Sequence, residues 1–336
     1  MGIHLDNKRA LSTLADAQRH PGKETWRRAA DEFFAPDAMV NVVHPFNALV
    51  GPQGYQRDYL ETLAQALDGL HRRDTILMGG RFADDDTGEE SDWVSATGHW
   101  CGHFANDLLG IRATDRMTFL RHGEFHRMEN GRAVESYVFL DLPELMIATG
   151  QWPIATGPGL ARGHVGYLPG PARQNGIPLH ESDPGESERS RTMVTDMLLK
   201  LATPDEAWRP YWHENMAWYG PAAFGAFLGV ERFRDFQVPF EDAFEGWAGG
   251  LRPDSPTRHF TRFGDGLFTC SGGWPSVTGI QRKPFMEQPA TNGRLFMRVC
   301  DWWVREGDRL TENWVFVDIP DTLMQMGVDV FGDLQR

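Results

Sequence analysis

The sequence predicts an α+β fold made of two tandem copies of one domain, and three observations support this. Residues 135–150 and 312–327 both read Glu, any residue, an aromatic, Val, Phe, an aliphatic, Asp, an aliphatic, Pro and an acid. Each copy begins with apolar residues at helical spacing and continues with apolar residues at every second position. Helices followed by a run of antiparallel strands are typical of the α+β class.

The repeat extends well beyond its most obvious stretch. Met39 matches Met216, Thr114 matches Thr291, Phe119 matches Phe296 and Trp100 matches Trp274, at spacings between 174 and 178 residues. Two copies of about 130 residues are the size of duplicated domains and not of solenoid repeats. We therefore expect a first domain over residues 1–150 and a second over residues 190–336.

Residues 151–189 connect the two copies and contain 13 glycines or prolines among 39 residues. This composition predicts neither helix nor strand, and so long a loop is unusual inside a compact protein. The segment is either a loose linker or a strap laid over a neighbouring surface. Its apolar residues, which include Trp152, Ile154 and Ile177, favour the strap.

Helices are expected at residues 23–34 and 192–201, where apolar side chains share one face. A further helix is expected after Gly51, with apolar residues spaced three or four apart from Tyr55 to Leu70. Its counterpart carries aromatic residues from Phe233 to Trp247, and Pro239 predicts a kink. Packing in the helical core is the preferred interpretation of these aromatic residues.

The last strand of each copy has two different faces, because alternate residues of a strand point the same way. One face carries Glu, an aromatic, Phe and Asp, and the opposite face is also apolar. Both faces are therefore expected to be covered, one by the helices or a pocket and the other by a second sheet. The aromatic row is a candidate pocket wall, formed by Tyr137 and Phe139 in one copy and by Trp314 and Phe316 in the other.

Asp141 and Asp318 end these strands and have two possible roles. The stretches DLPE and DIPD resemble helix starts, with the aspartate as N-cap, proline in the first turn and an acid at the third position. A cap requires no chemistry. The alternative is a carboxylate that transfers protons at the rim of a pocket, and the sequence leaves both open.

Composition excludes several classes of function. The chain has 336 residues and a formal net charge of −14, which argues against nucleic acid or an anionic membrane as partner. It has no run of 18 apolar residues, and its first 20 residues lack the apolar core of a signal peptide. Three cysteines without a CxxC pattern fit a reduced cytoplasm.

Residues 97–150, with the loop GIRAT, the turn ENGR and the strand ending in Asp141, resemble the SnoaL-like polyketide cyclases of the nuclear-transport-factor-two-like superfamily. The resemblance covers both copies. It implies two cystatin-like cones, each with helices wrapped by a curved antiparallel sheet around a pocket. It also implies that Asp141 and Asp318 act as general acid/base residues, without a metal or an organic cofactor.

Further candidates lie in the remaining strands. In the first copy His99 and His103 flank Trp100 on one face, and they join Asp141 as candidate catalytic residues. Residues four apart on a strand are separated by about 13 Å, which is too far for one zinc ion. The candidate substrate-binding residues are His44, Trp100, Trp218, Tyr219 and Trp274, together with the aromatic row. The first copy is richer in acid/base groups, so we expect the two copies to have diverged.

These observations favour a metal-free acid/base enzyme, such as a cyclase, dehydratase, isomerase or hydrolase, acting on a small and largely apolar carbonyl compound. The alternative is a non-catalytic small-molecule binding protein whose aspartates are helix caps. A structural role in a larger assembly is a third possibility. Because the two copies can pair within one chain, we expect a pseudo-dimeric monomer or a homodimer.

Overall fold

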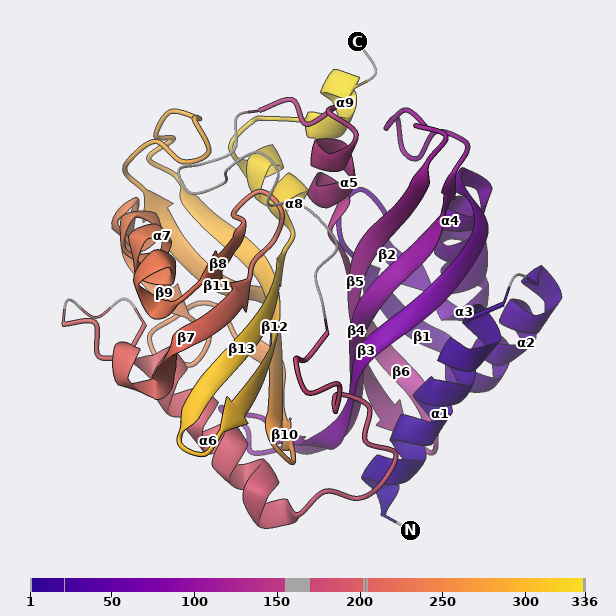
Figure 1. Ribbon diagram of the computed structural model, residues 1–336, viewed down its shortest axis with the longest axis horizontal. Coiled ribbons are helices and arrows are strands. Elements are labelled where there is room, and N and C mark those ends of the chain that lie inside the picture. The colour runs from indigo at the N-terminus through magenta and orange to yellow at the C-terminus, as the bar shows by residue number, and fades with distance from the viewer. Residues whose placement is uncertain (1, 21, 155–169, 202, 204, 335–336) are drawn as a thin grey trace.

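Each half of the chain forms a curved sheet with helices on one face, and the two sheets face each other across the middle of the molecule (Figure 1). The computed structural model describes residues 2–20, 22–154, 170–201, 203 and 205–334. Most of the apolar part of the predicted strap, residues 155–169, lies outside the described residues.

The first domain has a six-stranded sheet in the order β2-β1-β6-β5-β4-β3, antiparallel except for the parallel pair β1–β6. Its helices cover the face of the sheet that points away from the second domain (Figure 1). The elements are α1 (Ile3–Gln18), α2 (Lys23–Phe33), β1 (Phe34–Val42), β2 (Asn47–Val50), α3 (Gly51–Gly54), a π-helical turn (Tyr55–Leu60), α4 (Glu61–Ala66), β3 (Leu67–Ala83), β4 (Glu90–Phe104), β5 (Met117–Glu129), β6 (Arg132–Leu140) and α5 (Leu142–Ala148).

The second domain repeats this order, with the sheet β10-β11-β12-β13-β7-β8. Strand β9 also pairs with β11, so β9 and β10 together take the place that β3 has in the first domain. The elements are α6 (Pro184–Leu199), a 3-10 turn (Arg209–Tyr211), β7 (Trp212–Tyr219), β8 (Ala226–Leu228), α7 (Val230–Asp242), β9 (Phe244–Gly249), β10 (His259–Asp265), β11 (Phe268–Gln281), β12 (Arg294–Glu306), β13 (Arg309–Val317), α8 (Ile319–Gln325) and α9 (Val330–Leu334).

The predicted α+β fold with two tandem cones is confirmed, and three element boundaries differ from expectation. The helix after Gly51 stops at Ala66, so Leu70 lies on β3, and Phe244 and Trp247 lie on β9 instead of α7. Helix α6 begins inside the predicted linker, because Asp183 caps it by accepting a hydrogen bond from the Glu186 amide at 2.9 Å. In the part of the chain that is described, no helix has the length and apolarity needed to cross a membrane.

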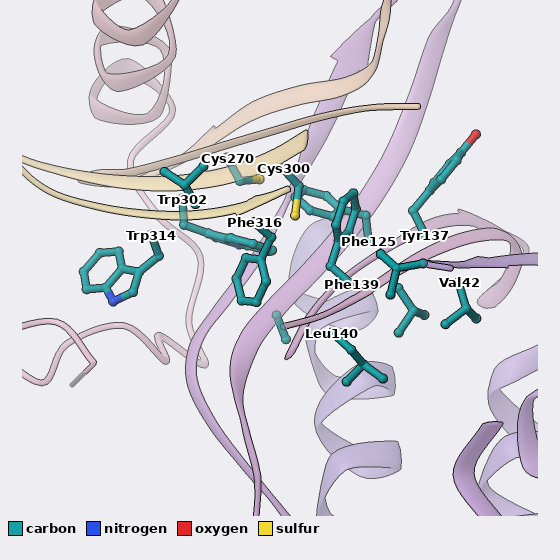
Figure 2. Packing of buried hydrophobic residues seen from close by; sticks show 14 of the residues in the cluster. Val42, Phe125, Tyr137, Phe139, Leu140, Cys270, Cys300, Trp302, Trp314 and Phe316 are labelled. Atoms are coloured by element: carbon teal, nitrogen blue, oxygen red, sulfur yellow. The ribbon is translucent and has the colours of Figure 1, made fainter. Parts of the chain in front are cut away.

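The two sheets pack through their outer faces, the faces away from the covering helices. Tyr137 stacks on Phe260 with ring centroids 3.8 Å apart. Figure 2 shows the centre of this interface, where Trp302 lies 4.8 Å from Phe125. A side chain at Gly123 would place its Cβ 2.5 Å from Trp302, so the close approach of the sheets requires glycine there.

A buried arginine crosses this interface. The Arg121 guanidinium of β5 donates to the carbonyl oxygens of Gly220, at 2.7 Å, and Val315, at 2.9 Å, in the second domain. It also lies 4.3 Å from the centre of the Phe316 ring. These contacts satisfy the hydrogen-bond donors of a guanidinium that is almost completely removed from water.

Asp141 and Asp318 form equivalent contacts across the domain interface, one from each domain. Each aspartate caps the following helix: Asp141 accepts from the Glu144 amide at 3.1 Å, and Asp318 accepts from the Asp321 amide at 3.3 Å. The second oxygen of Asp141 accepts from the Ala222 amide of the other domain at 3.0 Å.

The second oxygen of Asp318 completes the symmetry. It accepts from the His44 amide of the first domain at 3.0 Å and from Arg298 at 2.9 Å. Arg298 is the counterpart of Arg121, which pairs with Asp141 at 3.3 Å. The cap interpretation is therefore confirmed for both aspartates, and each cap is also a cross-domain hydrogen bond.

The described end of the connecting segment contacts both domains. The carbonyl of Gly176 accepts from the Leu77 amide on β3 at 2.7 Å. The Ala172 amide donates to the Glu312 carboxylate on β13, with both oxygens at 3.2 Å. This part of the segment is thus laid against the sheets as a strap.

We predict that Arg121→Ala lowers the free energy of unfolding by about 3–5 kcal/mol, because it removes the positive charge that pairs with buried Asp141 and the donor to the carbonyls of Gly220 and Val315. Urea unfolding measures the change. The matched control is Arg298→Ala, whose side chain is 23% exposed and should lose about 1–2 kcal/mol. Equal losses in the two variants would contradict this account of the interface.

Candidate functional site

The second cone encloses a cavity of about 140 Å³ between α7, the end of α6 and the inner face of its sheet. Its lining is mainly aromatic and aliphatic. Such a lining with a few polar groups is typical of small-molecule sites. The aromatic side chains include Trp212, Trp218, Phe224, Phe233, Phe236 and Phe240.

A row of polar side chains crosses the sheet at the inner wall of the cavity. His259, Ser271, Asp301 and Asn313 come from the consecutive strands β10, β11, β12 and β13, and all four line the cavity. Ser271 and Asp301 are direct partners in the sheet, so their side chains lie next to each other on one face. The sheet therefore brings together polar groups that are far apart in the sequence.

Asp301 is the central member of this row. Burial raises the pKa of its carboxyl to about 8, against the opposing effect of a hydrogen bond from Asn313. The Asn313 Nδ2 atom lies 3.4 Å from Asp301 Oδ1. A group with this pKa is largely protonated at neutral pH and can donate a hydrogen bond or a proton into the cavity.

His259 is neutral at the same pH. Burial, and then the charge of Arg262, lower the pKa of its imidazole to about 3. Arg262 Nη1 lies 3.4 Å from His259 Nδ1, and the tautomer that fits this contact carries its proton on Nε2. The imidazole is thus a second neutral polar group in the cavity wall.

The corresponding position in the first cone is Glu124, which pairs with Val138 on β6 as Asp301 pairs with Val315 on β13. Its environment is the opposite. The buried Arg72 guanidinium donates to Glu124, and to Asp74 at 2.8 Å. The charge of Arg72 holds the pKa of Glu124 well below its usual range although burial opposes it. The first cone thus carries an ionised network where the second has a protonated acid.

The aromatic row predicted as a pocket wall does not line this cavity, and the prediction is corrected here. The outer face of the last strands packs against the other sheet, and the inner face, with Asn313, Val315 and Val317, lines the cavity. Both faces are apolar, so the pattern alone did not distinguish them. The residues found in the interface are Tyr137, Phe139, Trp274, Trp314 and Phe316.

Two further predicted residues, Tyr219 and His44, have structural contacts. Tyr219 stacks beside Trp314 with ring centroids 5.5 Å apart. His44 donates its amide to Asp318, and its ring lies 5.7 Å from that of Phe331 on α9. Neither Tyr219 nor His44 lines the cavity of the second cone.

The two histidines that flank Trp100 lie on the outer face and in different surroundings. His99 is buried, and burial together with the charge of Arg121 lowers its pKa to about 3. His103 is exposed and forms an ion pair with Asp115 at 3.0 Å. With Asp141 and Asp318 engaged as caps, this arrangement does not favour the predicted catalytic group of Asp141, His99, His103 and Asp318.

Two predicted residues do point into the cones. Trp218 lines the cavity of the second cone. Trp100 lies inside the first cone, where its indole donates to the Tyr59 hydroxyl at 3.0 Å. Both follow from their place on inner faces of the strands.

Sequence reasoning missed Asp301, although the sequence carries a signal for it. Asp301 is a lone acid within the apolar stretch RVCDWWV, on a strand that was itself expected. An acid in the middle of a buried strand is unusual enough to be considered functional. As to metals, no three His, Cys, Asp or Glu side chains among the described residues are placed to hold an ion.

Comparison with known proteins gives similar folds for half of the chain at a time. No family model and no curated protein matches the sequence. A candidate SnoaL-like polyketide cyclase from Jannaschia sp. CCS1 is 18% identical with a TM-score of 0.33, covering 46% of this chain and 97% of its own. An NTF2-like protein from Burkholderia xenovorans LB400 is 12% identical with a TM-score of 0.32, covering 41% and 95%.

An LEH-like epoxide hydrolase from M. tuberculosis is also 12% identical, with a TM-score of 0.33 and coverage of 45% and 98%. Each of these three structures covers less than half of this chain.

We predict that Asp301→Asn changes the pH dependence of stability. In the unfolded chain an aspartate ionises near pH 3.9, whereas folded Asp301 keeps its proton up to about pH 8. The folded state therefore loses stability as pH rises from about 4 to about 8, and the asparagine removes this loss. At pH 8 the variant should be more stable by about 2–4 kcal/mol. This is less than the pKa difference alone would give, because the carboxyl is partly accessible from the cavity.

Urea unfolding at several pH values measures this difference. Glu144 and Asp318, whose pKa values are raised to about 8 and about 6 chiefly by burial, add the same trend to both proteins and cancel in the comparison. The control is Asp254→Asn, an exposed aspartate between β9 and β10, which should leave the profile unchanged. A variant that follows the wild-type profile would show that Asp301 is ionised.

Proposed function

We propose that this protein is an acid-catalysing enzyme that binds a small, largely apolar carbonyl compound in the second cone. The single observation that carries the proposal is the position of the Asp301 carboxyl in the wall of an aromatic cavity, where burial raises its pKa to about 8. Cyclisation, dehydration, isomerisation and hydrolysis each require a proton delivered to an oxygen of the substrate. Asp301 can deliver it at neutral pH, where an ordinary aspartate is ionised.

The surroundings of Asp301 suit this role. A carboxylic acid kept neutral by an apolar site donates a strong hydrogen bond to a carbonyl oxygen as negative charge develops there. Asn313 fixes one carboxyl oxygen, which leaves the other to face the ligand. His259 Nε2–H supplies a second neutral donor in the same wall.

The cavity limits the size of the ligand. At about 140 Å³ it is close to a cavity of about 150 Å³ that holds one benzene ring. Aromatic side chains such as Trp218 and Phe236 line it and favour a ring or a short branched chain. A single-ring ketone or aldehyde is therefore the simplest substrate model.

A non-catalytic binding protein is the second candidate. It is favoured by the engagement of Asp141 and Asp318 as caps, which removes the two residues that the family resemblance implied as catalysts. In that case Asp301 would orient the ligand by a hydrogen bond and no turnover would follow. The experiment below separates the two candidates.

We predict that the wild-type protein accelerates exchange of α-hydrogens for deuterium in enolisable single-ring ketones, measured by proton NMR in deuterium oxide. Asp301 delivers its proton to the carbonyl oxygen while solvent removes the α-hydrogen; the enol then takes a deuteron from solvent at carbon and returns its hydroxyl proton to Asp301. Asp301→Asn should slow this exchange by about 10²–10⁴-fold, because the amide cannot deliver a proton. The wild-type rate should be constant below about pH 8 and fall above it as Asp301 ionises.

The matched control is Glu312→Gln. Glu312 is a half-buried carboxyl on the face of β13 opposite to Asn313, and it accepts a hydrogen bond from Ala172 in the strap. Glu312→Gln, Asp141→Asn and Asp318→Asn should retain exchange. If Asp141→Asn or Asp318→Asn loses exchange while Asp301→Asn keeps it, the catalytic acid is the aspartate at the strand end and not Asp301. Binding of the ketones without exchange would support the binding protein.

The assembly and location of the protein stay predictions. The outer sheet faces are already paired within the chain, so we propose a pseudo-dimeric monomer in a reducing cytoplasm. Light scattering coupled to size-exclusion chromatography is expected to give the mass of one chain, 38.0 kDa. A mass of two chains would show that further surfaces associate.

A further inference from the structure

One cationic side chain lines the cavity of the second cone together with Asp301. Arg252 lies in the connection between β9 and β10, and its Nη2 donates to the Leu201 carbonyl at 3.0 Å. Within the ranges that the structure describes, no carboxylate is within ion-pair distance of this guanidinium. Arg252 is half-buried, so an anionic group of a ligand in the cavity can take the place of the water that completes its hydrogen bonds.

The first cone shows how the same fold satisfies an arginine internally. Arg72 lies on β3, whose place in the second domain is taken by β9, β10 and the connection that carries Arg252. Arg72 is neutralised by Asp74 and Glu124. In the second cone the counterpart of Glu124 is Asp301, which bonds to Asn313 and forms no ion pair with an arginine among the described residues.

Arg252 and Asp301 line the same cavity from different elements, Arg252 from the connection between β9 and β10 and Asp301 from β12. The other lining side chains are mainly aromatic and aliphatic. A ligand that meets both groups therefore needs one polar group for each of them and an apolar body for the rest of the lining.

We propose that the substrate is an apolar oxo acid whose carboxylate binds Arg252 while its carbonyl oxygen meets Asp301. This inference rests on the proposed function, because it places the carbonyl at the same acid. A guanidinium forms two parallel hydrogen bonds with a carboxylate, which fixes orientation as well as affinity. Arg252 is thus a specificity-determining residue and not a proton donor.

The test uses matched acids and amides, because an amide keeps the shape of the acid and removes its charge. The probes are 4-acetylbenzoate with 4-acetylbenzamide, and 3-benzoylpropionate with its amide. The wild type should bind each acid at least about tenfold more tightly than its amide, as expected for a charge-assisted pair, measured by NMR titration. In Arg252→Gln this preference should fall to less than twofold while affinity for the amides stays the same.

Arg252→Lys keeps the charge without the planar fork and should retain part of the preference. Arg252→Lys also keeps the test of the charge available if Arg252→Gln loses the bond to Leu201 and unfolds. Equal binding of acids and amides by the wild type, or a preference that survives Arg252→Gln, overturns the proposal. Asp301→Asn separates the two ideas: it should leave the acid preference intact, whereas failure of the proposed function shows as unchanged deuterium exchange in that variant.

Discussion

The buried contact between Arg121, Asp141 and the backbone of the opposite domain is the constraint on which the rest of the molecule depends. A guanidinium and a carboxylate that are both nearly removed from water are stable only with a full set of hydrogen bonds. Those bonds come from Gly220, Val315 and Ala222 across the interface. The pairing of the two sheets is therefore fixed in position, and the mirror contact through Asp318 and His44 fixes it a second time.

This constraint decides which face of each strand is free for chemistry. Side chains alternate along a strand, so every residue that serves the interface on β12 or β13 alternates with one that faces the cone. Trp302 and Phe316 contact the first domain, and Asp301 and Val315 line the cavity. The acid at the strand end belongs to the interface, and the acid within the strand belongs to the cone.

The sequence predicts the strands and the duplication well, and it gives the helix caps as one of two interpretations of Asp141 and Asp318, because each depends on local or periodic patterns. Ser271, Asp301 and Asn313 come together only through the register of three strands, which a single sequence does not contain. The sides of the last strand could not be distinguished, since Tyr137 on one face and Val138 on the other are both apolar. The predicted helix after Gly51 extends beyond Ala66, where α4 ends, because Leu67 and Leu70 continue the helical spacing into β3.

The two cones differ in how they place charge on the inner face of the sheet. In the first, Arg72 pairs with Asp74 and Glu124, and Gln18 accepts a further bond from Arg72 at 3.0 Å. In the second, β3 is divided into two shorter strands, and the acid that would balance an arginine is held neutral by its apolar surroundings. A cavity with a cation and a neutral acid favours a ligand that brings its own negative charge, because binding then removes an unbalanced charge instead of creating one. The two cones thus differ in the source of the charge that balances an arginine: Asp74 and Glu124 supply it in the first cone, and in the second we propose that the ligand supplies it.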